Sequence, residues 1–179
     1  ILLVTCLILA ISCKEETDPF LITEHSIGLL TDSTQVKELK AIFSNDSISK
    51  YIGGDEFTGN INDIDVYQDG GSHLLTLTPF ESLDSTSTIK SVKIVDSRYK
   101  TTKGISKLST FGDIQNKYKI SRIQNTLSNV VVSVDAINAY FTIDKQELPA
   151  ELRYDMDLKI EALQIPEKAK IKSFYIHWF

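Results

Sequence analysis

Histidine, cysteine and carboxylate residues are the groups that could bind a metal ion, but their spacing in this sequence does not favour a site. His25, His73 and His177 lie far apart, and none has a second His or Cys at ligand spacing. Residues 63–70 alternate carboxylates like the start of a calcium loop, yet Leu74 stands where the bidentate Glu is needed. We therefore expect a solvated strand and a turn here, and neither a metal nor another cofactor.

Activated nucleophiles and phosphate-binding loops do not stand out in the sequence either. No serine lies in a Gly-x-Ser-x-Gly elbow, and the pairs Gly53-Gly54 and Gly70-Gly71 lack the Gly-Lys of a nucleotide-binding loop. The net charge is −5, the pI is near 5.2, and lysines are interspersed with acidic residues, so no basic stripe could neutralise phosphates. We expect neither catalysis nor binding to nucleic acid.

The first eleven residues form an uncharged apolar run that matches a signal-peptide hydrophobic region and is too short to span a bilayer. The run lacks a preceding basic segment, and we expect the start of the signal to be missing from this sequence. Residues 9–13 (Leu-Ala-Ile-Ser-Cys) resemble the lipobox of bacterial lipoproteins, with Ala10 where the family usually has Leu. The resemblance implies a signal peptide over residues 1–12, lipidation of Cys13 and therefore a membrane partner. The alternative is a short buried element in which Cys6 and Cys13 are inert core residues.

The residues after Cys13 bear on where such a lipoprotein is sorted. Lys14 follows the cysteine, whereas lipoproteins retained in the inner membrane often have Asp there. Lys14, Glu15 and Glu16 also resemble the lysine and acidic residues that export some Gram-negative lipoproteins to the cell surface. The resemblance implies an outer-membrane lipoprotein of a Gram-negative bacterium, facing the periplasm or the surface, with residues 13–25 as a flexible tether. The alternative is that these charges are merely solvated.

One polar connection in the chain has the composition of a binding loop. Residues 96–103 combine several charged side chains with an aromatic one after a predicted strand. We predict that Arg98, Tyr99 and Lys100 contact a partner, for which another envelope protein is the expected class. The alternative is a solvated loop whose Tyr99 folds onto the core.

The periodicity of the apolar residues predicts both helices and strands. Apolar residues at helical spacing predict helices over 34–43, with Ser33 or Thr34 as N-cap, and over 109–118. Alternating apolar and polar residues predict strands, at 61–67, 74–78, 89–95, 129–134, 139–143 and 171–179. The apolar phases of these elements predict a set of buried side chains, namely Leu39, Phe43, Ile114, Tyr118, Val131, Phe141 and Phe174.

A shift of 75 positions aligns the two helices and the segments after them, for example Leu39 with Ile114. This alignment indicates that residues 27–95 and 102–178 are duplicated halves; the alternative is that any two capped amphipathic helices share this much pattern. In either case we expect residues 26–179 to form one α+β domain. In it, two helices pack on a mostly antiparallel sheet. The pattern resembles the small helix-plus-sheet lipoproteins of the outer-membrane assembly machinery and the tandem β-lactamase inhibitor fold. The resemblance implies protein binding.

The sequence therefore predicts a lipid-anchored envelope lipoprotein that acts as a non-enzymatic binding or assembly-support module. The alternative is a lipoprotein that binds or hydrolyses a glycan or another small ligand. That alternative requires a deep pocket lined by Trp178 or by tyrosines, and hydrolysis also requires two converging carboxylates. A shallow face would favour the binding module.

Overall fold

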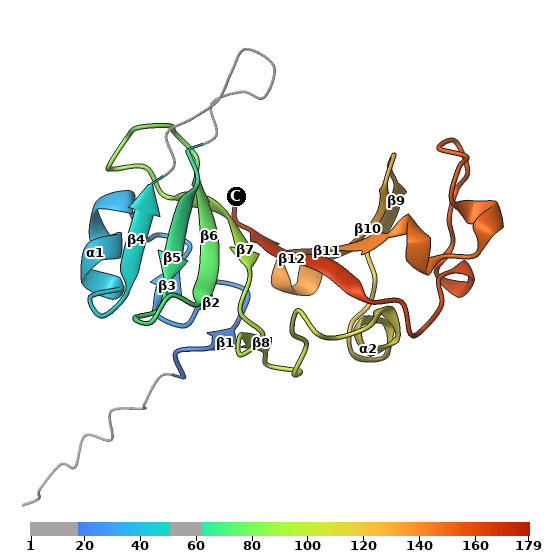
Figure 1. Cartoon of the computed structure of the whole chain (residues 1–179), viewed down its shortest axis with the longest axis horizontal. Coiled ribbons are helices and arrows are strands. Elements are labelled where there is room, and N and C mark those ends of the chain that lie inside the picture. Colours follow the sequence, from blue (N-terminus) through green and yellow to red (C-terminus); the bar gives the residue numbers. More distant parts are fainter. Residues whose placement is uncertain (1–17, 51–61) are drawn as a thin grey trace, which may run out of the picture.

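The computed structural model describes residues 18–50 and 62–179, which form two β-sheets with short helices around them (Figure 1). The larger sheet has eight strands, β4 (Ser47–Lys50), β5 (Ile64–Tyr67), β6 (His73–Pro79), β7 (Ile89–Ile94), β9 (Arg122–Asn125), β10 (Asn129–Val134), β11 (Ala139–Asp144) and β12 (Ile171–His177). The smaller sheet has four strands of two residues each, β1 (Leu21–Ile22), β2 (Ser26–Ile27), β3 (Leu30–Thr31) and β8 (Lys100–Thr101). The fold is therefore α+β, as expected, with strands in the majority.

The helices are shorter than the sequence pattern predicts. The first consists of a 3-10 turn, η1 (Val36–Glu38), that continues into α1 (Leu39–Ile42). It begins after the predicted N-caps because the Thr34 hydroxyl instead accepts a hydrogen bond from the backbone N–H of Thr31, at 2.9 Å. The second, α2 (Phe111–Lys117), lies within the predicted range 109–118, and Thr110 is its N-cap. Further 3-10 turns follow, η2 (Asp135–Ile137), η3 (Lys145–Glu147), η4 (Ala150–Leu152) and η5 (Ala162–Gln164).

The eight-stranded sheet is antiparallel throughout and has a symmetric strand order. Its strands lie in the order β4-β5-β6-β7-β12-β11-β10-β9, so each half of the chain supplies four neighbouring strands. The halves meet where β7 pairs with β12, with Phe174 opposite Ile94. In each half the four strands follow a helix, α1 in the first and α2 in the second.

One face of the large sheet carries the hydrophobic core. The side chains on this face alternate with outward-facing ones, as in the buried positions 130, 132 and 134 of β10. Five of the predicted core residues are buried, namely Leu39, Ile114, Tyr118, Phe141 and Phe174. Phe43 is only partly buried against the core. The prediction for Val131 is wrong, because Val131 lies between buried neighbours and its side chain points to the opposite face of the sheet.

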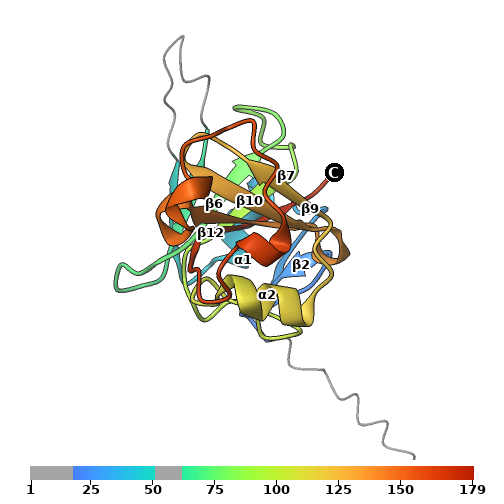
Figure 2. The ribbon, with the colours of Figure 1, turned by 90° about the vertical axis from the view of Figure 1, so that its right-hand side faces the viewer.

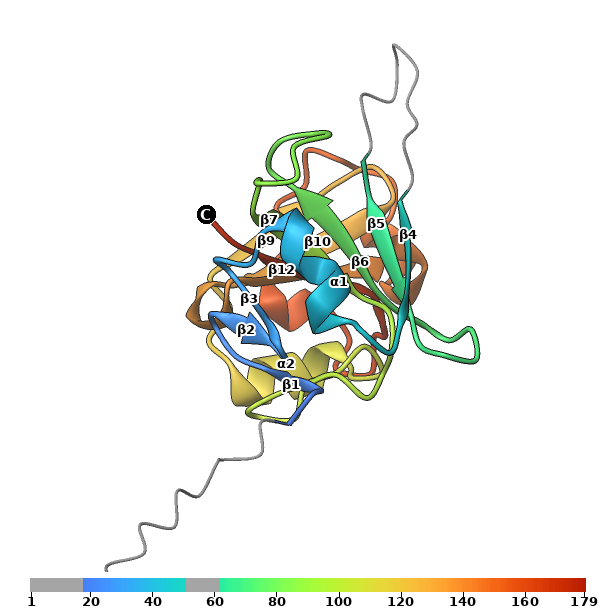
Figure 3. The same cartoon turned by 90° about the vertical axis from the view of Figure 1, so that its left-hand side faces the viewer.

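Among residues 18–50 and 62–179, the helices and the connections cover this core face, and none of them covers the other face of the sheet. Figure 2 shows α2 below the strands of the second half, and Figure 3 shows α1 nearest to the viewer in front of β6. The backbone N–H of Gly112 donates to the carbonyl oxygen of Glu167 at 2.8 Å, which fixes α2 against the turn before β12. A Cβ at Gly112 would lie 3.0 Å from this oxygen, so any other residue here would push the turn slightly away from α2.

The small sheet joins the start of the described chain to the core. Its strand β1 pairs in parallel with β8, and Ile22 is fully buried. The C-terminal Trp178 is also buried, and its indole N–H donates to the carbonyl oxygen of Glu24 at 3.2 Å. The expected tether over residues 13–25 is therefore too long, because residues 21–25 belong to the folded domain.

Candidate functional site

The uncovered face of the large sheet displays one side chain from every strand in a single cross-strand row. Directly opposite residues of paired strands lie on the same face of a sheet. The strand register places eight of them in this row, in the order Ser49, Asp65, Thr76, Lys93, Tyr175, Tyr140, Ser133 and Arg122. We call this set the outer row. It combines polar and charged side chains with two large aromatic ones at its centre.

Two stacked tyrosines stand at the centre of the outer row. The rings of Tyr140 and Tyr175 are nearly parallel, at 8°, with their centroids 4.6 Å apart. The Nζ atom of Lys93 lies 6.0 Å from the Tyr175 ring, within the range of a cation–π contact. Burial and the neighbouring Tyr175 raise the pKa of the Tyr140 hydroxyl, and a hydrogen bond with the Ser91 side chain opposes the rise. Tyr140 is therefore neutral at pH 7, and the stacked pair presents a rigid amphipathic surface.

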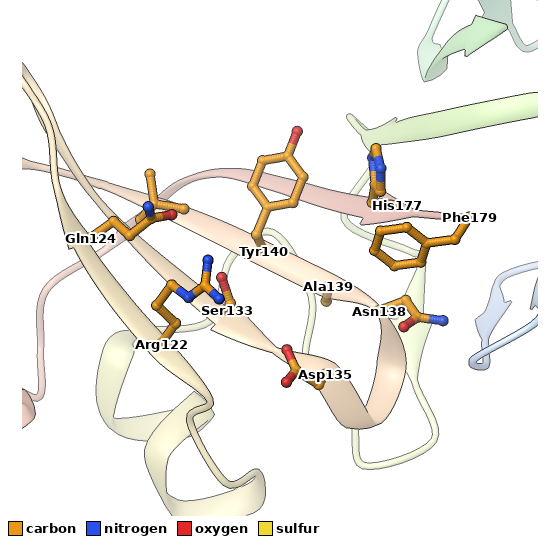
Figure 4. Close-up of a pocket in the computed structure, with 10 residues that line it drawn as sticks. Arg122, Gln124, Ser133, Asp135, Asn138, Ala139, Tyr140, His177 and Phe179 are labelled. Atoms are coloured by element: carbon orange, nitrogen blue, oxygen red, sulfur yellow. The ribbon is translucent and has the colours of Figure 1, made fainter. Parts of the chain in front are cut away.

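A hollow of about 770 Å³ lies beside Tyr140 on the uncovered face (Figure 4). Figure 4 shows the Tyr140 and His177 side chains rising from the sheet on the side away from the helix below. The hollow has a mixed polar and aromatic lining, which includes Arg122, Gln124, Ser133, Asp135, Asn138, Tyr140, His177 and Phe179. Asp135 is the one carboxylate among these lining residues. The hollow therefore lacks the pair of carboxylates that glycan hydrolysis requires.

His177 closes one end of the hollow. Its ring packs edge to face with Phe179, at a centroid distance of 4.9 Å. Burial lowers the pKa of the imidazole, and the positive charge of Lys90 lowers it further. His177 is therefore a neutral hydrogen-bonding and aromatic group at pH 7.

The first half of the uncovered face holds a His, an Asp and a Thr in mutual contact, but not in a catalytic arrangement. The Thr76 hydroxyl donates to Asp65 Oδ1 at 2.7 Å, and His73 Nε2 lies 3.1 Å from the same oxygen. The same His73 nitrogen lies 3.1 Å from the Leu75 carbonyl oxygen, which can only accept. The nitrogen facing Thr76 thus carries the proton and cannot act as a base toward the hydroxyl. This cluster serves to satisfy the Asp65 carboxylate.

The predicted binding loop is mostly engaged within the protein. Tyr99 is buried, with an exposed fraction of 3%, and its ring packs edge to face on Phe20. The prediction that Tyr99 contacts a partner is therefore wrong, because its side chain belongs to the core. Burial also raises the pKa of its hydroxyl to about 12. Arg98 donates to Asp96 and to Gln68, at 2.8 and 2.6 Å. The hydrogen bond from Arg98 holds the pKa of the Asp96 carboxyl below its ordinary value.

Lys100 is the third residue of that loop, and its side chain is exposed on strand β8. Strand β8 belongs to the small sheet, so Lys100 does not lie on the uncovered face. The expected glycan-binding residue Trp178 does not line the hollow either, because its ring is buried in the core. Tyr140, rather than Trp178, supplies the aromatic surface there.

The residues of the predicted lipid anchor and sorting signal, Cys13, Lys14, Glu15 and Glu16, lie outside the described residues. Within 18–50 and 62–179, no group of three or more His, Cys, Asp or Glu could hold a metal ion. In the same described ranges no helix has the length and apolar character needed to cross a membrane.

Comparison with known proteins supports the fold and gives no function. No family model matches the sequence, and neither does any curated protein. The crystal structure of the uncharacterized protein yfeY from Escherichia coli is similar, with a TM-score of 0.58 and 15% sequence identity. The similarity covers 87% of this chain and 98% of that chain. At this identity the likeness shows a common fold alone.

Sequence reasoning did not single out Tyr140 and Tyr175 as a site. Each stands on the polar phase of its strand, where a large aromatic side chain is less common than a small polar one. That signal was available in the sequence. The stacking of the two rings could not be predicted from the sequence, because it depends on the pairing of β11 with β12, which a long connection separates in the chain.

Proposed function

We propose that this chain is a lipid-anchored envelope lipoprotein that acts as a non-enzymatic binding or assembly-support module. The partner would contact the uncovered face of the eight-stranded sheet. The observation that carries the proposal is the stacked pair of Tyr140 and Tyr175 in the outer row. Tyrosine and arginine are enriched among the residues that dominate binding energy, and the outer row contains both kinds.

The shape of the uncovered face favours a large partner over a small ligand. The hollow beside Tyr140 is open rather than enclosed, and polar side chains from the turn after β10 and from β9 surround it. Small-molecule sites instead bury most of the surface of their ligand. With Asp135 as its one lining carboxylate, the hollow gives no support to the alternative of a glycan-hydrolysing enzyme.

Cross-linking from the uncovered face tests this proposal. A photoreactive amino acid replaces Gln124, which is exposed beside the hollow, in the full-length protein in its own bacterium. The matched control places it at Lys168, exposed in the turn next to α2 on the covered side. The proposal is supported if position 124 gives adducts that are absent from position 168. Equal adducts from both positions, or none from 124, refute it.

Cell fractionation tests the lipid anchor. The small Ser12 before Cys13, the apolar leader and the charged residues after it form one consistent signal. A lipoprotein carries two or three acyl chains, which give stable membrane binding where one chain gives only marginal binding. We expect Cys13→Ala protein to be unprocessed or to leave the outer-membrane fraction. Fully processed Cys13→Ala protein that stays in that fraction would exclude a lipid anchor on Cys13.

We also propose that residues 27–95 and 102–178 are duplicated halves. The strand order supports this, because each half places a helix before four neighbouring strands and the halves meet at β7 and β12. Superposition of the two halves of an experimental structure tests the proposal. If α1 and β4 do not fall on α2 and β9, the duplication is rejected.

A further inference from the structure

We propose that the side of the domain formed by β8, α2 and the connection between them rests on anionic headgroups of the bilayer that holds the lipid anchor. This inference rests on the proposed function, because it requires a lipid on Cys13. It follows from a lysine-rich segment, from exposed leucines beside it and from the place where the described chain begins.

Residues 100–119 carry an excess of positive charge in an acidic chain. We call these residues, which run from β8 through α2, the basic segment. It contains a single carboxylate, on Asp113, and five lysines, namely Lys100, Lys103, Lys107, Lys117 and Lys119, in a chain whose net charge is −5. Lys107 is partly exposed and the other four lysines are exposed. The segment is the exception to the interspersed charges of the rest of the chain.

Two of these lysines are held close together without a carboxylate between them. The Lys103 Nζ atom donates to the backbone carbonyl oxygen of Lys117 at 2.8 Å and lies 4.6 Å from the centre of the Tyr118 ring. The Lys117 Nζ atom lies near Gly104, 3.7 Å from where a Cβ of that residue would be. Within residues 18–50 and 62–179, none of the five lysines forms an ion pair. Their charges are therefore available to anions outside the protein.

The segments packed against the basic segment reduce its excess charge but do not cancel it. Strand β1 pairs with β8, and residues 167–170 hydrogen-bond to α2 and contact Glu147. With residues 96–98, these neighbours supply four carboxylates and three cations, namely Asp18, Asp96, Glu147 and Glu167 against Arg98, Lys168 and Lys170. All of these groups keep their charge, and the surface retains an excess of three positive charges.

Exposed leucines accompany the lysines. Leu108, in the connection between β8 and α2, has an exposed fraction of 75%. Leu29 is 58% exposed in the turn between β2 and β3, and it lines a small cavity together with Pro19 and Phe20 at the start of the described chain. Apolar side chains that enter the headgroup region and cations that attract anionic lipids together make a surface bind to a bilayer.

The described chain begins beside the basic segment. Strand β1 pairs in parallel with β8, with Leu21 opposite Lys100, and Figures 1 and 3 both place β1 and α2 at the lower end of the molecule. The five residues from Cys13 to Asp18 span at most about 18 Å, whereas a compact domain of this size is roughly 40 Å across. A lipid on Cys13 would therefore hold this end of the domain next to the bilayer.

This proximity selects a bilayer as the occupant rather than an acidic protein. The attraction of lysines to anionic lipids falls off within a Debye length, about 8–10 Å at ordinary salt concentrations. The anchor brings the lysines within this range of the headgroups. Figure 4 shows Tyr140 and His177 rising on the side of the sheet away from the helix below. With α2 on the bilayer, the uncovered face would point into the aqueous compartment and stay accessible to the partner proposed above.

Photo-cross-linking in vesicles tests the contact. The full-length lipidated protein is purified and inserted through its anchor into vesicles of phosphatidylethanolamine and phosphatidylglycerol. A photoreactive amino acid replaces Leu108, which is exposed, so the fold is preserved. The matched control is Leu127, with an exposed fraction of 77%, in the turn that follows β9 at the end remote from α2 (Figure 1). We expect phospholipid adducts from position 108 and at least about tenfold fewer from position 127.

Charge reversal and vesicle composition identify the headgroup chemistry. Lys100→Glu combined with Lys117→Glu should lower the lipid adducts from position 108 at least about tenfold, because each lysine near an anionic surface strengthens binding about fivefold. Lys37→Glu combined with Lys40→Glu, exposed on the first helix, should leave them unchanged. Vesicles of phosphatidylcholine alone should lower the adducts of the unaltered lysines similarly, and this measurement needs no charge variant.

Other outcomes separate this inference from the proposed function. If the lipidated protein stays on the vesicles but positions 108 and 127 give equal lipid adducts, the docked orientation is overturned and the anchor stands. Adducts from position 108 that respond neither to charge reversal nor to phosphatidylcholine overturn the role of anionic headgroups. A protein as the main adduct from position 108 in intact cells overturns the bilayer as occupant. A chain that carries no lipid on Cys13 refutes the anchor itself, and this inference with it.

Discussion

The stacked pair of Phe141 and Phe174 offers a direct test of which sheet face is the core. Phe141 is fully buried on β11, and its ring centroid lies 4.6 Å from that of Phe174 on β12. Truncation of a buried Phe to Ala costs about 3–5 kcal/mol, of which the aromatic pair accounts for about 0.5–1.5 kcal/mol. With a urea m value of about 2 kcal/mol/M, Phe141→Ala should lower the unfolding midpoint by about 1.5–2.5 M.

Urea unfolding followed by tryptophan fluorescence measures this midpoint, since the single Trp178 is buried in the same core. Val131→Ala is the matched control, because Val131 belongs to the neighbouring strand and points to the uncovered face, where truncation costs under about 1 kcal/mol. Phe141→Leu keeps most of the volume and serves if the alanine variant does not fold. If Val131→Ala and Phe141→Ala cost the same, the assignment of the two faces is wrong.

Three further changes test local features of the fold. Gly28 has a φ of +58° and its Cβ would lie 2.1 Å from the carbonyl oxygen of Pro19, so Gly28→Ala should cost more than about 1 kcal/mol. Gly70 also has a positive φ, +98°, but open space around its Cβ, so Gly70→Ala shares the backbone strain without the contact. It should cost clearly less in the same urea titration, and equal costs would contradict the contact. Tyr99 has its pKa raised to about 12, while an unfolded tyrosine titrates near 10, so the unfolded state loses its proton first as the pH rises. The free energy of unfolding should therefore fall between pH 10 and 12, by up to about 1.4 kcal/mol per pH unit more than in the Tyr99→Phe variant. Identical pH profiles of unfolding for the two proteins would refute this. The Thr110 hydroxyl caps α2 by accepting a hydrogen bond from the backbone N–H of Asp113. Thr110→Ala should therefore lower the free energy of unfolding by about 1 kcal/mol, measured by thermal unfolding. Thr110→Ser keeps the hydroxyl and should restore the unfolding midpoint.

The strands of the large sheet were predictable where the alternation was clean and a turn residue followed. Gly70 and Gly71 have positive φ between β5 and β6, and Asn138 adopts the left-handed conformation between β10 and β11. In β10, residues 130, 132 and 134 are all valine, whereas Val131 shares its phase with Asn129 and Ser133, so the sequence itself indicated the buried phase. The polar partners of Val131 on the neighbouring strands, Gln124 and Thr142, agree with this assignment.

Other features depend on contacts that no local pattern records. The phase of Ile89 differs from that of Val92 because a register shift between Thr78 and Pro79 lets β7 begin at residue 89. The two-residue strands of the small sheet are too short to show a period. The binding loop was misjudged at Tyr99 because a tyrosine in a polar loop is equally compatible with an exposed contact and with a ring folded onto the core.

The place of β12 has a consequence for the order in which this protein can fold. The last strand of the chain lies at the centre of the large sheet, between β7 and β11, and Trp178 just after it is tied back to Glu24. Until the final residues are released, β7 and β11 both remain unpaired edges. A nascent chain therefore cannot complete its native sheet while it is still being made. Under the proposed function the chain would be exported, and this delay would keep it unfolded for passage through a secretion channel. The late pairing also means that a product truncated before residue 171 exposes two open strand edges, which favour aggregation.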